Sequence, residues 1–195
     1  MSRRLLTLGA LSAAAFVASV VLSGCSGDSD DADDATSATT NADGTTVAGT
    51  TLQVGQPAVV NFAAGKKHTS KVRLTVTKVE QGRVKDFERF KLNDSARRST
   101  IYYVSTRVKN LGPDALSGKT VTLYGKVSDT TVVPPVVLES TFPACDYQPL
   151  PPKFEKDDST RVCMVFMAPR HGTMSEVQWR PAGSSEPISW TPVQR

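Results

Sequence analysis

The chain has 195 residues, 22% of them charged, with a net charge of +4 at pH 7, three Cys and two His. This length allows one ordinary domain with appendages. Aromatic residues make up only 7%, and His is scarce, which argues against a His-rich metal centre and against a large aromatic platform for nucleic acid.

Residues 1–24 have the composition of an export signal. Arg3 and Arg4 precede a run of apolar and small residues that ends at Leu22. A run of about 18 apolar residues is long enough for a membrane span. A basic start, an apolar middle and a small-residue exit are nevertheless typical of a secretory signal peptide. The sequence therefore predicts a signal peptide over residues 1–24, exported by the general or the twin-arginine route.

The exit of this segment, Leu22-Ser23-Gly24-Cys25, resembles the lipobox of bacterial lipoproteins. In that family a diacylglycerol is attached to the Cys and the peptide is cut just before it. The resemblance implies that Cys25 is lipidated and anchors the chain at the extracytoplasmic face of the cell membrane. An uncleaved anchor, or an ordinary signal with a stray Cys, is the alternative.

Residues 25–50 hold six Asp, no Lys or Arg, and otherwise mainly Ser, Thr, Gly and Ala. Such a segment buries too little surface to offset its chain entropy. We expect a disordered acidic tether with an r.m.s. span of roughly 25–30 Å. Its Ser and Thr hydroxyl groups are of the kind that accept O-linked sugars, but the sequence contains no signal for glycosylation.

Residues 51–195 have the size of a single domain. All but two of the 23 Lys and Arg and all but six of the 19 Asp and Glu lie here, which leaves a net charge of +8. Apolar and polar residues alternate with the period of half-buried strands, and Pro- and Gly-rich turns separate them. The pattern predicts an all-β antiparallel sandwich or barrel with one loop or short helix at 84–92. The expected strands are 72–77, 100–109, 120–128, 160–168, 174–180 and 187–191.

Two Cys remain in the domain, Cys145 and Cys163. Export places them in an oxidising environment, so we expect a structural disulfide. A metal site needs more soft ligands, and a redox pair usually has CxxC spacing. Those two readings stay as the alternatives.

No constellation of catalytic residues is evident, and we expect no enzyme, no cofactor and no metal site. Arg170-His171-Gly172 resembles the motif of histidine phosphatases, but it lies between two expected strands rather than before a helix. Asp157 and Asp158 lack the ligand spacing of a calcium loop. Both segments are interpreted as surface turns.

Eleven Lys and Arg occupy residues 66–98 against four acidic residues. We name Lys66, Lys67, Arg97 and Arg98 as a candidate patch for an anionic lipid or an acidic wall polymer. A scattered, solvated surface is the alternative. Export excludes nucleic acid as a partner.

The run from Tyr102 to Gly112, an alternating strand ending in Val-Lys-Asn-Leu-Gly, resembles the signature of DUF4352-type immunoglobulin-like domains of Gram-positive lipoproteins. The segment 161–169, the strand with Trp179 and the closing 188–190 resemble the same family, and together they cover about residues 52–191. The resemblance implies an immunoglobulin-like β-sandwich without an agreed activity. We therefore expect a lipid-anchored, non-enzymatic binding or accessory module of the cell envelope. The alternative is a structural spacer or assembly subunit that binds another envelope protein through a sheet edge.

Overall fold

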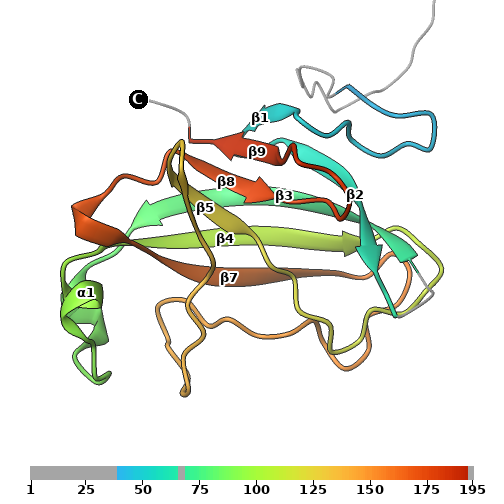
Figure 1. Cartoon of the computed structure of the whole chain (residues 1–195). Helices are drawn as coiled ribbons and strands as arrows, with labels where there is room; N and C mark the ends of the chain where they lie inside the picture. Colours follow the sequence, from blue (N-terminus) through green and yellow to red (C-terminus); the bar gives the residue numbers. More distant parts are fainter. Residues whose placement is uncertain (1–38, 66–68, 193–195) are drawn as a thin grey trace, which may run out of the picture. The chain divides into compact units, whose positions relative to one another are not determined.

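The computed structural model describes residues 39–65 and 69–192, which form two β-sheets with few helices (Figure 1). One sheet has the strand order β1-β9-β8-β5-β6 and the other has the order β2-β3-β4-β7. This arrangement is consistent with the expected β-sandwich. The strands are β1 (Thr51–Gln53), β2 (Pro57–Ala63), β3 (Thr69–Gln81), β4 (Thr100–Asn110), β5 (Tyr124–Ser128), β6 (Thr131–Val133), β7 (Ser159–Ala168), β8 (Glu176–Trp179) and β9 (Ile188–Thr191). The helices are η1 (Val84–Phe87), α1 (Asp94–Arg97) and η2 (Pro169–His171).

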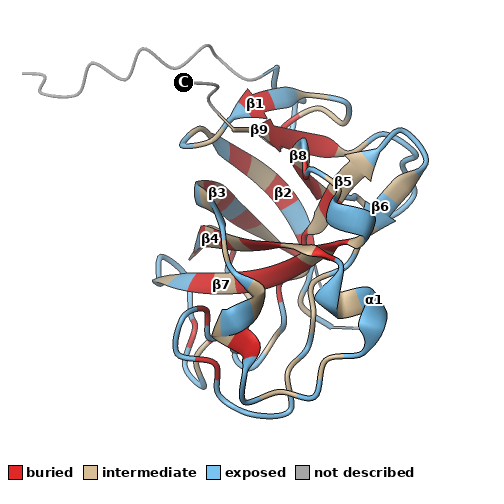
Figure 2. Ribbon diagram, turned by 90° about the vertical axis from the view of Figure 1, so that its left-hand side faces the viewer, coloured by how far each residue is buried: buried red, intermediate tan, exposed pale blue. Residues whose placement is uncertain are grey.

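Alternation along the strands builds the main core (Figure 2). Successive side chains of a strand point to opposite faces of its sheet. Most inward residues of β3, β4 and β7 are apolar and join those of β8 and β9 in one cluster. Trp190 of β9 is fully buried in it, and its indole Nε1–H donates to the carbonyl of Gln56 at 2.9 Å. A large aromatic side chain is thus buried without leaving its polar atom unpaired.

Several details differ from the sequence prediction, which did not include β1, β2 and β6. β1 pairs with β9 in parallel, although we expected only antiparallel pairs. The strand expected at 120–128 begins only at Tyr124, because the preceding stretch buries Val121 and Leu123 without pairing in a sheet. The unpredicted helix α1 is a single turn, capped by Asn93, whose side chain accepts from the amide of Ala96.

The expected tether also ends earlier than residue 50. Residues 39–50 fold back on β2: the amide of Thr46 donates to the carbonyl of Val59, and Thr46 Oγ1 accepts from the amide of Val59. A tight turn at Gly44, with φ +81°, brings Thr46 opposite Thr40. The prediction of disorder was based on amino-acid composition. Composition does not show that the edge of β2 offers backbone hydrogen-bond partners to this segment. The structure does not describe residues 1–38, which include the predicted signal peptide, Cys25 and the first part of the predicted tether.

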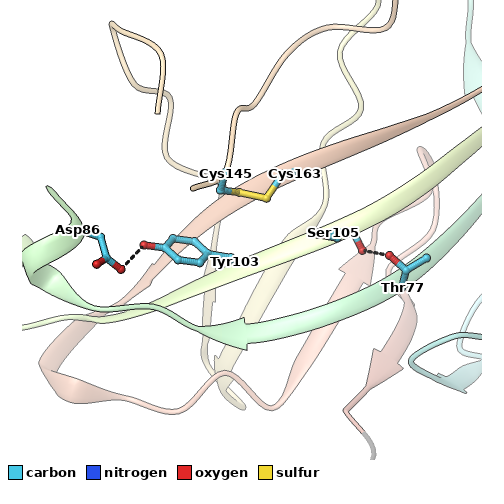
Figure 3. Close-up of a disulfide and its surroundings, with 6 residues drawn as sticks. All are labelled: Thr77, Asp86, Tyr103, Ser105, Cys145 and Cys163. Carbon is cyan, nitrogen blue, oxygen red and sulfur yellow. Dashed lines mark hydrogen bonds between the residues drawn. A yellow bond between two sulfur atoms is a disulfide. The ribbon is translucent and has the colours of Figure 1, made fainter. Parts of the chain in front are cut away.

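A second, smaller core lies on the outer face of the four-stranded sheet. It contains Phe87 from η1, Phe142 from the segment 136–148, and Ile101 and Val165 from β4 and β7. The rings of Phe87 and Phe142 stack with centroids 4.5 Å apart. The predicted disulfide between Cys145 and Cys163 is confirmed and ties this segment to β7 (Figure 3). The outer core therefore consists of irregular segments fixed covalently to a strand.

Replacing both Cys145 and Cys163 by Ala should lower the free energy of unfolding by roughly 3 kcal/mol, because the bridge closes a loop of 18 residues. Urea denaturation of the oxidised wild type and the double variant measures the difference. The same variant treated with reductant is the control, since it has no bond left to lose. Equal stability of the oxidised wild type and the variant would show that the outer core is stable without the disulfide.

Candidate functional site

The outer face of the four-stranded sheet is apolar at one end and basic at the other. The apolar end lies under the outer core, at Tyr103 and Val165. The basic end carries six outward-pointing cations that we call the basic face: Lys71, Arg73 and Lys78 on β3, Arg107 and Lys109 on β4, and Arg161 on β7.

Strand register sets these cations directly against one another. Arg73 of β3 lies opposite Lys109 of β4, and Arg107 of β4 lies opposite Arg161 of β7. Directly opposed residues have Cβ atoms about 4.5–5.5 Å apart, and like charges in such pairs are destabilising. The fold therefore holds positive charges together at a cost in stability.

Only half of the cations have an anionic partner within the described chain. Lys71 pairs with Asp43 at 3.9 Å, Lys78 with Glu80 at 2.6 Å and Lys109 with Asp157 at 3.2 Å. Asp43 remains ionised, because hydrogen bonds from the side chain and the amide of Thr45 lower the pKa of its carboxyl.

The other three cations, Arg73, Arg107 and Arg161, are exposed and form no hydrogen bond or ion pair with the described residues. An arginine guanidinium presents a planar fork of donors that fits phosphate or carboxylate oxygens in a bidentate way. These three side chains are therefore free to bind anionic groups.

The structure does not bring Arg97 and Arg98 to the basic face. Both are exposed and follow the Gln81 end of β3, whereas Lys71 and Arg73 lie near its Thr69 end. A strand of 13 residues is about 43 Å long. The Nε of Arg97 donates to the carbonyl of Leu92 at 3.2 Å. Lys66 and Lys67 lie outside the described residues, so their part of the predicted patch stays a prediction.

Sequence reasoning missed Arg107, Lys109 and Arg161 because it looked for basic residues close together along the chain. The signal was present in another form. Arg107 and Arg161 each occupy a polar position in a strand whose alternate residues are apolar. The pairing of β4 with β7 then places the two on one face, and the register of two distant strands is not visible in composition.

Tyr103 and Asp86 form the most perturbed titratable pair of the outer core (Figure 3). The Tyr103 hydroxyl donates to the carboxylate of Asp86 at 3.0 Å, and Arg83 pairs with that carboxylate at 3.3 Å. Burial, together with this hydrogen bond, raises the pKa of Tyr103. The phenol therefore stays protonated at neutral pH and fastens η1 to the sheet instead of acting as a base.

The segment that resembled a phosphatase motif forms the short helix η2 directly after β7. Arg170 and His171 both have φ 55°, and the amide of His171 donates to the carbonyl of Arg98 at 2.8 Å. The His171 side chain is exposed. Across residues 39–65 and 69–192, no three His, Cys, Asp or Glu side chains group so that they could hold a metal ion.

The fold and its basic face thus define a β-sandwich-like domain with a cationic sheet surface. No protein-family model, no curated protein and no solved structure matches this chain. In the part of the chain that the structure describes, no helix has the length and apolar character needed to cross a membrane.

Replacing Arg161 by Gln should raise the free energy of unfolding by a few tenths of a kcal/mol at low salt, because it removes the repulsion from Arg107. The gain should shrink as salt is added, since exposed charges are screened. Thermal denaturation at two ionic strengths measures both effects. Arg89→Gln, an exposed cation with no opposed charge, should leave stability unchanged. A destabilised Arg161→Gln variant would mean that the opposed pair carries no net repulsion.

Proposed function

We propose that this chain is a lipid-anchored, non-enzymatic binding module of the bacterial cell envelope, built on an immunoglobulin-like sandwich, that holds an acidic polymer on its basic face. The two-sheet fold agrees with the architecture that the DUF4352-type resemblance implies. The disulfide supports an extracytoplasmic location, because such bonds persist in oxidising compartments.

The observation that carries the proposal is the group of three unpaired arginines on adjacent strands. Arg73, Arg107 and Arg161 spread across β3, β4 and β7, so they reach several anionic groups at once. A polymer with repeated phosphate or carboxylate groups supplies such an array on one molecule, and each further contact then forms at a high effective concentration.

The carboxylates around the basic face favour a polymer over a lipid surface. Asp43, Glu80 and Asp157 each pair with a lysine of the face. A flat anionic bilayer that covered the whole face would also meet these carboxylates and be repelled by them. A narrow chain is able to contact the arginines while avoiding the carboxylates.

The edges of the sheets favour a binding module over a spacer that adds a partner strand. At the β2 edge, both the amide and the carbonyl of Val59 are already hydrogen-bonded to Thr46. At the β7 edge, the amide of Val136 donates to the carbonyl of Val165. β1 and β6, at the ends of the other sheet, have three residues each. Strand addition needs a longer free edge.

Replacing Arg73, Arg107 and Arg161 together by Gln should weaken binding of poly(glycerol phosphate) at least tenfold at 0.1 M salt, because three charge-assisted contacts are lost. The protein is the chain from residue 25 with Cys25→Ser, and calorimetry measures the affinity over a range of salt concentrations. The matched control is the Arg89, Arg97 and Arg98 triple Gln variant, which loses the same charge from exposed positions elsewhere.

The control variant should bind like the wild type. If it loses the affinity and the sheet variant keeps it, the patch predicted from the sequence is the site, and Lys66→Glu and Lys67→Glu would extend that test. Equal binding of wild type and sheet variant to phosphatidylglycerol vesicles is also expected. Loss of vesicle binding without loss of polymer binding would make the ligand a lipid surface.

Replacing Cys25 by Ala should release the protein from membranes into the medium or the wall fraction, because the lipid is then absent. Intact mass of the wild-type protein from native membranes should show a chain that begins at Cys25 and carries a diacylglycerol. A chain without lipid that still fractionates with membranes would contradict the anchor and favour an uncleaved signal. This result would leave the proposal for the basic face untouched.

A further inference from the structure

Two adjoining hollows share Trp179 in their walls, and neither is lined by the arginines of the basic face. One, of about 370 Å³, is lined by residues that include Phe62, Lys119, Tyr124 and Arg180. The other, of about 320 Å³, reaches the folded-back segment at Thr46. Both hollows share Asn61, Ala63, Trp179 and Ala182 in their walls. We call this pair of hollows the Trp179 groove.

The groove has an aromatic wall. The rings of Phe62 and Trp179 stack with centroids 6.0 Å apart and an angle of 27° between their planes. Phe62 belongs to the main core, and Trp179 packs against that core while remaining half-buried. The core thus holds a flat apolar surface in a fixed position beside the groove.

The indole N–H of Trp179 is a buried donor without an acceptor among the described residues. Trp190, the other tryptophan of the chain, donates its N–H to Gln56. Leaving a buried donor unpaired costs about 1–3 kcal/mol. Because this nitrogen has no accessible surface, the groove meets the ring of Trp179 and not its N–H.

Polar groups complete the lining on one side. Lys119 and Arg180 supply positive charge, and Asn61, Thr120, Thr122 and Tyr124 supply an amide and hydroxyl groups. One guanidinium nitrogen of Arg180 donates to Gln178 Oε1 at 2.9 Å, while Lys119 has no ion pair with the described residues. Specific pockets typically combine an apolar wall with a few polar groups that fix orientation.

We propose that the Trp179 groove binds the ring of an anionic sugar, either a uronate or a sugar phosphate. A pyranose ring presents an apolar face of C–H groups that fits the aromatic wall. Its hydroxyl groups exchange hydrogen bonds with Asn61 and the threonines. Its carboxylate or phosphate pairs with Lys119 and Arg180. A purely aliphatic ligand would leave these polar groups unpaired. The inference does not depend on the basic face.

The two tryptophans make the groove observable. Trp179 lines the groove and Trp190 is fully buried elsewhere in the core, so a bound sugar should change the fluorescence of Trp179 alone. Titration of the chain from residue 25 with glucuronate and with glucose 6-phosphate should give a saturable change. Glucose, which has the sugar ring but no charge, tests the need for the anionic group. Benzoate, which has a carboxylate but no sugar ring, tests the need for the sugar. Both should bind at least tenfold more weakly than glucuronate.

Calorimetry of glucuronate binding then assigns the residues. Trp179→Leu, which removes the aromatic ring from the wall, should weaken binding about tenfold, which corresponds to about 1.4 kcal/mol. Lys119→Gln with Arg180→Gln should remove the preference for glucuronate over glucose. The control is the Arg73, Arg107 and Arg161 triple Gln variant, which should bind glucuronate like the wild type.

Three results would overturn the proposal. The first is that neither glucuronate nor glucose 6-phosphate changes the fluorescence or produces heat. The second is that benzoate binds as tightly as the sugars. The third is that Trp179→Leu binds like the wild type. Since polymer binding by the basic face is measured with different variants, failure of either proposal is distinguishable from failure of the other.

Discussion

The pairing of β4 with β7 is the constraint on which the rest of the structure depends. The two strands are in register from Thr100 opposite Ala168 to Lys109 opposite Ser159. Their inward side chains supply much of the main core. Their outward side chains form a second face that the other sheet does not cover. A sheet with one partner must either cover its second face or make it polar, and this pair of strands does both.

The disulfide lies at the boundary between the covered part and the basic part of this outer face. Cys163 is opposite Ser105; the row on one side of that pair holds Tyr103 and Val165, and the row on the other side holds Arg107 and Arg161. The apolar rows are covered by segments that contain little regular structure, so the cover gains few backbone hydrogen bonds of its own. A covalent bond to β7 compensates for that by limiting how far the segment 136–148 is able to move when it opens. The same bond fixes where the cover ends and the basic face begins.

Alternation was enough to predict most strands, because side-chain period follows directly from backbone geometry. The Cys145–Cys163 bond was predictable because only two Cys remained once Cys25 was set aside. What alternation does not contain is register. Arg107 opposite Arg161, and the parallel pair of β1 and β9, depend on which distant strands become neighbours. The folding back of Thr46 onto β2 depends likewise on a strand edge that exists only in the folded domain.

Local features that oppose stability point to function when a route to solvent or ligand is present. Among the described residues, Thr106 Oγ1 and Trp179 Nε1 are buried side-chain atoms without a partner. Thr106 lies inside the main sandwich, opposite Val76 and Val162, and lines neither hollow of the Trp179 groove. Its orphan hydroxyl is a cost of packing alone. Trp179 lines two hollows with cations beside them, and the repulsion between Arg107 and Arg161 is exposed at the surface. An anionic ligand would remove the repulsion between the two arginines, so a binding role would give a physical reason for keeping them opposed.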